Sequence, residues 1–240
     1  AGAGYVIFTL GQNSGYYCSP NAAYDKHCGY ESGTHCSKRD LPMELADALA
    51  KQGIRFMLYL PSRAPQADEV AMKGLSDVNE RQPAPQAFTE KWSEVIREWS
   101  WRYGTKVSGW WFDGSYNTKG WDDLTQPNNW NTWAAACRAG NPDSILAFNP
   151  GTDISKAFTA LCAQQDYTAG ERNDFDTERQ LFNFQDNQFK NNVLWGSLAN
   201  VAMKINNRHK INLQGTYSTN PDNIISSPAG SDFEQRSEER

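Results

Sequence analysis

Hydrophobic and polar positions follow two alternating patterns along this chain. Short, nearly continuous apolar runs are typical of strands that are buried on both faces. These runs lie at residues 5–10, 55–60, 107–113 and 145–149. Between them, apolar residues recur at helical spacing, in stretches that cover residues 40–53, 88–104 and 129–138. This part of the chain is therefore predicted to alternate between strands and helices.

Residues at the ends of the helical stretches strengthen the prediction. Asp40 is a favourable N-cap for the first helix, and Gly53 closes it. The second helix is the clearest in the chain, and Gly104 ends it. Its apolar face consists of Phe88, Trp92, Val95, Ile96 and Trp99. These large side chains predict core packing against a sheet.

Later elements are predicted from shorter patterns. We expect a short helix at 153–160 and a strand end with a loop at 162–171. Two more strands are expected at 193–198 and 210–213, on either side of a helix near 199–207.

Strands that alternate with helices predict a parallel sheet with helical crossovers. The fold class is therefore α/β, and a (β/α)8 TIM-type barrel of about 250 residues suits a chain of 240. About seven strands are predicted, so the barrel would be incomplete at its N-terminal side. A doubly wound open sheet is the alternative, but no Gly-x-Gly-x-x-Gly motif follows the first strand. We expect one barrel domain at 1–225 and a polar tail at 226–240.

Two connections are long. Residues 11–39 are dense in Gly, Ser, Asn and Tyr and are predicted to form a loop, and loops of this length are usually functional. Residues 65–85 are predicted to be a polar connection with at most a short helix.

Five cysteines give information about the cellular compartment of the protein. They are Cys18, Cys28, Cys36, Cys137 and Cys162. Three fall in the first long loop, which favours a disulfide-pinned loop in an oxidising compartment, and we expect a secreted, extracellular or periplasmic protein. A zinc site from His27, Cys28, His35 and Cys36 is the alternative, although the spacing matches no compact zinc knuckle.

Charge and composition exclude some partners. The net charge is −5, without a cluster of Lys or Arg, so no nucleic-acid partner is expected. No apolar run is long enough to cross a bilayer, and no signal peptide opens the chain. The sequence contains 9 Trp and 10 Tyr, and such rings pack in cores and stack on sugars.

Asp113 is the strongest candidate for chemistry. It ends the run Val107-Ser108-Gly109-Trp110-Trp111-Phe112-Asp113 and precedes Gly114. In a barrel of alternating strands and helices, side chains at the carboxyl ends of the strands form the active site. The alternative is an aspartate that only hydrogen-bonds the turn after it.

Several motifs together resemble the α-L-fucosidase-like retaining glycoside hydrolases, which are (β/α)8 barrels. The motifs are Ala3-Gly4-Tyr5-Val6-Ile7-Phe8-Thr9, Lys38-Arg39-Asp40-Leu41, Gly53-Ile54-Arg55-Phe56 with Leu58-Tyr59, and Trp111-Phe112-Asp113-Gly114. The resemblance covers the first half of the chain well and the second half loosely. It implies that Asp113 is the catalytic nucleophile, and it implies no metal or organic cofactor.

A retaining glycosidase also needs a second carboxylic acid, about 5–5.5 Å from the nucleophile, to protonate the leaving oxygen. Glu171 is the candidate, because it follows a strand-like segment and one branch of the family has its acid/base at a comparable point. Asp166 and Asp174 are the substitutes. The alternative is a solvated glutamate that pairs with Arg172.

The chain departs from the family in two places. The first barrel strand, with its His-Trp-Gly end, is absent, so a separate N-terminal segment or another chain is expected to complete the barrel. The His-His pair that grips the sugar is replaced in the loop after the first strand. Gln12 and Asn13 are expected to hydrogen-bond the sugar instead, and Tyr16 or Tyr17 to stack on it; the alternative is a loop that satisfies its own polar groups.

Two tryptophans complete the expected substrate site. Alternation along a strand places Trp110 and Trp111 on opposite faces and puts Trp111 on the face of Asp113, so Trp111 is expected at the pocket wall. Trp195 is a second candidate. The sequence thus predicts a retaining exo-glycosidase that binds a carbohydrate, an α-L-fucoside or related glycoside. The alternatives are an inactive glycan-binding or structural barrel, and a different hydrolase on the same scaffold.

Overall fold

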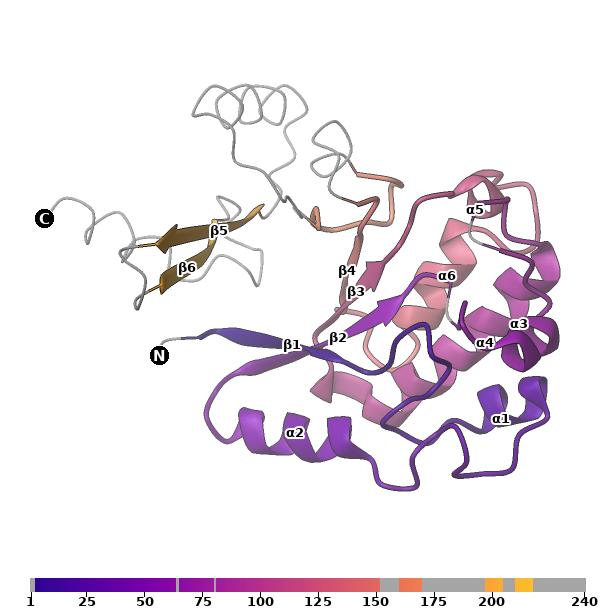
Figure 1. Cartoon of the computed structure of the whole chain (residues 1–240), viewed down its shortest axis with the longest axis horizontal. Coiled ribbons are helices and arrows are strands. Elements are labelled where there is room, and N and C mark those ends of the chain that lie inside the picture. Colours follow the sequence, from indigo (N-terminus) through magenta and orange to yellow (C-terminus); the bar gives the residue numbers. More distant parts are fainter. Residues whose placement is uncertain are drawn as a thin grey trace, which may run out of the picture.

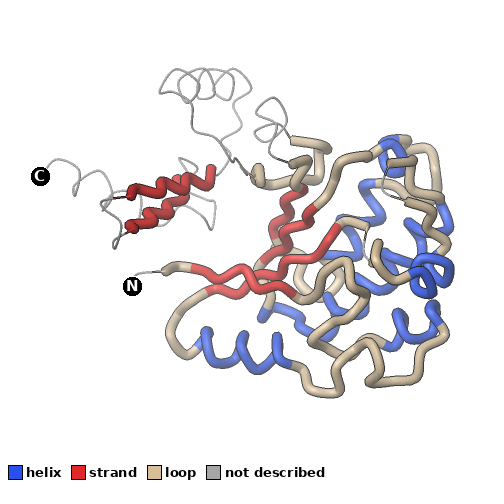
Figure 2. The backbone as a smooth tube through the Cα atoms, in the orientation of Figure 1, coloured by secondary structure: helices blue, strands red, loops and turns tan. Residues whose placement is uncertain are grey.

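The structure, a computed structural model, describes residues 3–63, 65–79, 81–151 and 160–169, and the backbone of two further strands. Its main sheet has four parallel strands in the order β1-β2-β3-β4. The strands are β1 (Tyr5–Thr9), β2 (Arg55–Pro61), β3 (Gly109–Asp113) and β4 (Ile145–Phe148). Figure 2 shows them as neighbouring red segments. All four match the predicted apolar runs, and the parallel sheet is confirmed.

Helices connect the strands and gather on one side of the sheet (Figure 1). They are α1 (Ala22–Cys28), α2 (Leu41–Ala50), α3 (Glu69–Leu75), α4 (Gln86–Tyr103), α5 (Lys119–Asp122) and α6 (Trp130–Cys137), with a 3-10 turn at Gly104–Lys106. Among the residues described, no helix is both long and apolar enough to cross a membrane.

The helix boundaries follow local signals where the sequence supplies them. Asp40 caps α2 by accepting a hydrogen bond from the Met43 N–H (3.2 Å), as predicted. The helix stops at Ala50, three residues before Gly53, which has φ 68° in the turn that follows. Gly104 ends α4 as predicted. The short helix expected between 65 and 85 is α3.

The main core lies between the sheet and the helices. Trp92 and Trp99 of α4 are buried, as predicted. Phe112 of β3 packs against Trp133 of α6 and Phe148 of β4, with ring centroids 5.1 and 5.3 Å away. Burial of such rings supplies much of the stabilisation of a core. The strands are therefore held on one face by aromatic packing.

The two faces of β3 separate its tryptophans, which confirms the prediction from alternation. Trp110 is buried under the helices and donates its indole N–H to the Cys137 carbonyl (3.2 Å). Trp111 lies in a smaller cluster on the other face, with Met57 and Tyr167. Asp113 shares this second face.

Three predictions about secondary structure are wrong. The long loop at 11–39 contains helix α1. The helix expected near 199–207 is in part strand, because β5 (Ser197–Lys204) pairs antiparallel with β6 (Lys210–Tyr217). The strand end expected at 162–171 is absent from its described part, 162–169. The helix expected at 153–160 and the tail at 226–240 lie outside the described residues, apart from residue 160.

The cysteines are all free thiols, so the expected disulfides are not formed. The expected disulfides were the main reason to predict a secreted protein, and that prediction loses this support. The zinc alternative fails as well, since no three His, Cys, Asp or Glu side chains within the described ranges are grouped to hold a metal. His27 instead pairs with Glu94 (2.8 Å), and the His35 ring stacks between Tyr16 and Tyr30.

Burial makes these thiols poor nucleophiles. It raises the pKa of Cys18 and Cys162 to about 11 and that of Cys28 to about 12, and the thiolate is the reactive form. Iodoacetamide at pH 8 should therefore label the folded protein roughly a hundredfold more slowly than the unfolded chain. The rate should rise as the pH approaches 11. Mass spectrometry of the labelled protein measures both, and a disulfide in the unreduced protein would contradict this account.

Candidate active site

Asp113 lies at the carboxyl end of β3 with a partly buried side chain. The main chain there is tied to both neighbouring strands, because the Asp113 carbonyl accepts from the Ser62 N–H (2.7 Å) and the Phe112 carbonyl from the Asn149 N–H (2.7 Å). Gly114 then turns the chain away with φ 68°, a value that glycine adopts without strain. The carboxylate is thus presented at a fixed strand end.

Three donors from three strand ends hold the carboxylate. Oδ1 accepts from the Gly114 N–H and from Asn149 Nδ2, both at 2.8 Å. Oδ2 accepts from the Tyr59 hydroxyl at 2.5 Å. Tyr59 belongs to β2, and Asn149 follows β4. The sheet therefore fixes the orientation of this one carboxylate from both sides.

The carboxylate opens into a small hollow, which we call the Asp113 cleft. It encloses about 180 Å³ and is lined by residues from several loops and strand ends: Gln12, Asn13, Tyr59, Pro61, Arg63, Asp113, Gly114 and Tyr116. Gln12 Nε2 donates to the Tyr59 hydroxyl at 2.7 Å. A hydrogen-bond chain therefore leads from the loop after β1, through Tyr59, to Asp113.

Arg63 brings a buried positive charge to the wall of this cleft. Its side chain is 3% exposed and forms a two-point ion pair with Asp77, which is completely buried. A third hydrogen bond goes to the Gln82 carbonyl, and the guanidinium lies 5.7 Å from the centre of the Phe88 ring. The guanidinium is thus held by three hydrogen bonds within the protein and anchors the cleft wall.

Only some of the other residues that were predicted to contact the sugar line the Asp113 cleft. Gln12 and Asn13 line the Asp113 cleft, as expected for residues that meet a substrate. Trp111, which was expected at the pocket wall, is not among the residues that line the cleft; it stacks on Tyr59, with ring centroids 5.2 Å apart. Tyr16 is exposed but stacks on His35 outside the cleft lining.

Tyr17 requires a correction. It is 3% exposed and packs in the core against Tyr24, Trp92 and Trp99, with ring centroids 4.9 to 6.4 Å away. A ring that is enclosed by the core cannot stack on a sugar in the cleft. The aromatic surroundings from α1 and α4 explain its position, and Trp92 and Trp99 are distant from Tyr17 in the sequence.

Of the candidates for the second carboxylate, Asp166 is the one that lies within the described residues. Glu171, Asp174 and Trp195 lie outside the described residues. Asp166 is described, and its carboxylate accepts from Arg138 (2.6 Å) and from the Leu146 N–H (2.8 Å). Both bonds fix Asp166 beside β4, and it is not among the residues that line the Asp113 cleft.

Sequence reasoning missed Tyr59, Asn149, Arg63 and Tyr116 as site residues. The signal for Tyr59 was the register of the sheet, which places Tyr59 opposite Trp111, on the same face as Asp113. Asn149 directly follows the β4 run, at the same edge of the sheet.

An oriented carboxylate at the edge of a cleft can attack an electrophilic carbon or accept a proton.

Residues 1–211 match the family described as alpha-L-fucosidase. No protein of curated function matches the chain significantly.

Solved structures of two endo-fucoidan hydrolases share the fold. The endo-fucoidan hydrolase MfFcnA4 of glycoside hydrolase family 107 superposes with a TM-score of 0.55 at 19% identity, over 76% of this chain and 33% of its own. A second one, MfFcnA9, gives 0.53 at 20% identity, over 76% and 40%. The α-L-fucosidase AlfC from Lactobacillus casei gives 0.38 at 16% identity, over 60% and 47%. The chain thus spans between a third and a half of the length of these proteins.

Proposed function

Because this chain belongs to the α-L-fucosidase family, we propose that it hydrolyses α-L-fucosides or related glycosides with retention of configuration. The observation that carries the proposal is the Asp113 carboxylate, held by three donors at the edge of a cleft. A nucleophile has to face the anomeric carbon in one orientation, and these three bonds supply that orientation.

The proposed reaction has two steps. The Asp113 carboxylate attacks the anomeric carbon while the bond to the leaving oxygen breaks, and a second carboxylic acid gives its proton to that oxygen. This step forms a covalent glycosyl-Asp113 intermediate. The second residue, now a base, takes a proton from water, and the water displaces Asp113. Two inversions at the same carbon leave the configuration unchanged.

Glu171 is the proposed acid/base, with Asp174 as the substitute. Asp166 is the weaker substitute because its carboxylate is already bound by Arg138 and the Leu146 N–H. The mechanism requires the second carboxyl group about 5–5.5 Å from Asp113.

The size of the Asp113 cleft supports an exo-acting enzyme. Pockets for drug-sized ligands typically enclose about 300–1,000 Å³, whereas this cleft encloses about 180 Å³. A space of this size suits a single terminal sugar. Gln12 and Asn13 supply amide groups for its hydroxyls.

The proposal includes a (β/α)8 barrel. The four strands are parallel, and their helices lie on one side of the sheet, which is the arrangement of half of such a barrel. The remaining strands would come from the rest of this chain, a preceding segment or another chain. In this barrel the strand ends that carry Tyr59, Asp113 and Asn149 form the catalytic face.

The proposed activity can be tested with a panel of aryl glycosides of different sugars. We expect turnover of aryl α-L-fucosides above that of the other sugars. Proton NMR of the first product should show α-L-fucose before it mutarotates. β-L-Fucose as the first product would overturn retention. Binding of fucosides without turnover of any panel member would instead identify the chain as a glycan-binding protein.

Tyr59→Phe tests the support of the nucleophile. The change removes the donor to Asp113 Oδ2 and the acceptor for Gln12, while the ring can still stack on Trp111. We expect kcat to fall about tenfold to a hundredfold, with a small change in KM. Tyr103→Phe is the matched control, because it removes a buried hydroxyl that donates to Ser19 (2.5 Å) far from the cleft. Equal kcat in both variants would contradict a positioning role for Tyr59.

A further inference from the structure

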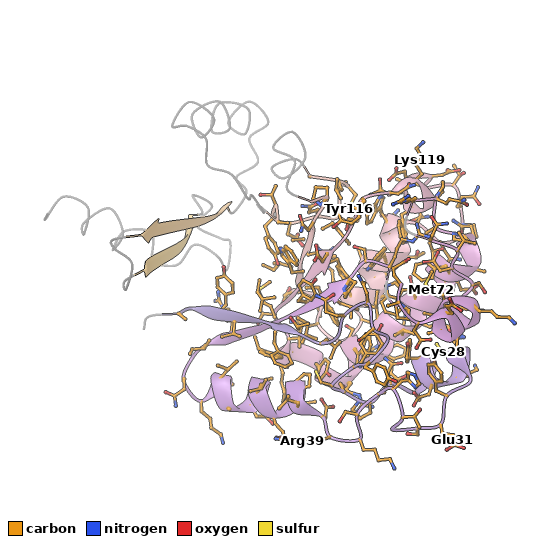
Figure 3. All side chains as sticks on the ribbon, viewed as in Figure 1. Cys28, Glu31, Arg39, Met72, Tyr116 and Lys119 are labelled. Atoms are coloured by element: carbon orange, nitrogen blue, oxygen red, sulfur yellow. The ribbon has the colours of Figure 1, made fainter. Side chains whose placement is uncertain are left out.

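A second hollow adjoins the Asp113 cleft and is not used by the mechanism above. This outer cleft encloses about 570 Å³ and is lined by Arg81, Tyr116, Asn117, Thr118, Lys119 and Asp122. Tyr116 lines both hollows. Figure 3 shows Tyr116 and Lys119 along the same edge of the molecule. A chain of sugars that enters the Asp113 cleft can therefore continue past Tyr116 into the outer cleft.

Two cations from different segments meet in the outer cleft. Arg81 comes from the connection between α3 and α4, and Lys119 from the start of α5. Asn117 joins the two segments, because its Nδ2 donates to the Arg81 carbonyl (3.0 Å) and its Oδ1 accepts from the Lys119 N–H (3.3 Å). Asn117 thus holds together the main-chain positions from which the two cationic side chains extend.

Among the described residues, no ion pair matches the charges of these two cations. Within the described part of the chain, neither the Arg81 guanidinium nor the Lys119 ammonium forms an ion pair or hydrogen bond. Asp122, the acid of the lining, already accepts from Trp130 Nε1 (2.9 Å) and from the Thr118 hydroxyl (3.0 Å). The outer cleft therefore carries one excess positive charge in a chain whose net charge is −5.

Tyr116 gives the outer cleft a surface for a sugar ring. Its side chain is 57% exposed, and a Cβ added at Gly114 or Gly151 would meet this ring at 3.6 or 3.2 Å. The ring thus lies close to two glycines, while more than half of the residue remains exposed. Flat aromatic surfaces of this kind stack on sugars.

From these observations we propose that the outer cleft binds the sugar next to the cleaved fucoside and selects glycans that carry an acidic group on that sugar. The group is an oxyanion, either a sulfate ester or a carboxylate. Arg81 offers a planar fork of N–H donors, and Lys119 adds a point charge. This inference rests on the proposed function, since it assumes that a fucoside occupies the Asp113 cleft.

The test measures binding by calorimetry at low ionic strength. The protein is the full chain with Asp113→Asn, so that no probe is hydrolysed. The probes are α-L-fucosyl-N-acetylglucosamine, the same disaccharide with a sulfate ester on its second sugar, and α-L-fucosyl-glucuronic acid. We expect one or both acidic probes to bind about tenfold tighter than the neutral one. The probe that gains affinity identifies the acidic group as sulfate or carboxylate.

The gain should disappear when Arg81→Gln and Lys119→Gln are combined, and it should shrink at high salt. The matched control is Lys51→Gln with Lys73→Gln, which removes the same charge from two exposed sites outside both clefts and should keep the gain. Equal affinity for all three probes, or a gain that survives in the Arg81/Lys119 variant, would overturn the proposal. Hydrolysis by the unchanged protein is measured separately, so a failure of the proposed activity is distinguishable from a failure of this inference.

Discussion

Replacing Asp113 by asparagine is expected to reduce kcat for an aryl α-L-fucoside roughly ten-thousand-fold or more. The amide cannot form the covalent bond to the anomeric carbon. It can still accept at Oδ1 from Gly114 and Asn149, but its NH2 group cannot accept from the Tyr59 hydroxyl. The free energy of unfolding should therefore fall by about 1–3 kcal/mol. Steady-state kinetics and urea denaturation measure the two effects.

Asp143→Asn is the control for this change. Asp143 is an exposed aspartate in the connection before β4, and its loss alters the charge of the chain equally. The control should keep the full kcat. Comparable turnover in the two variants would remove Asp113 from the chemistry.

Asp77→Ala is expected to have the largest effect on stability, about 3–5 kcal/mol. The variant leaves the Arg63 guanidinium, 3% exposed, without its carboxylate. A buried charge that loses its partner keeps its cost of desolvation. Because Arg63 lines the Asp113 cleft, activity should fall in the same variant. Urea denaturation gives the change in the unfolding free energy.

Two further variants test whether the loss of stability in Asp77→Ala is caused by breaking the ion pair. Arg63→Met combined with Asp77→Leu removes both charges and should recover most of the lost stability. Glu44→Ala breaks the pair between Arg39 and Glu44, whose side chains are 69% and 52% exposed, and should change the unfolding free energy far less. A loss in Asp77→Ala no larger than that in Glu44→Ala would show that the buried pair is unimportant.

The elements that were predicted correctly are those whose formation depends on residues close together in the sequence. The strands β1 to β4 are apolar runs, and β2 to β4 are largely buried. β1 was expected to be buried on both faces but lies at the edge of the sheet, where Ile7 is 38% exposed. Helix α4 was predictable because its own residues supply its apolar face and Gly104 supplies its end. Asp113 was predictable for the same reason, since neighbouring residues determine both the strand that it ends and the turn that follows.

Elements that depend on distant partners could not be predicted in this way. Helix α1 begins where the Glu98 carboxylate of α4 accepts from the Ala22 and Ala23 N–H groups (2.8 and 2.7 Å). Asn21 also reaches across to the Val95 carbonyl (2.9 Å). Asn21 is also a local N-cap, since its side chain accepts from the Tyr24 N–H (2.7 Å). The two bonds to Glu98, 75 or more residues away, leave no pattern in the local sequence.

Strand pairing explains two other differences. The helix formers Ala199, Ala202 and Met203 lie in β5, because pairing with β6 outweighs local propensity. Tyr59 was missed for a related reason, since its place beside Asp113 depends on the register between β2 and β3. The prediction of disulfides was wrong because cysteines that cluster in the sequence do not necessarily have their sulfur atoms in bonding geometry.

Trapping the covalent intermediate tests the central claim most directly. A 2-deoxy-2-fluoro-α-L-fucosyl fluoride reacts through a good leaving group, while the fluorine at C2 slows hydrolysis of the intermediate, because both steps pass through an oxocarbenium-like transition state. Mass spectrometry of the intact protein and of its peptides then locates the label. We predict one fluorofucosyl group per chain, attached to Asp113. Label on a different residue, or none under conditions where the reagent inhibits turnover, would contradict Asp113 as the nucleophile.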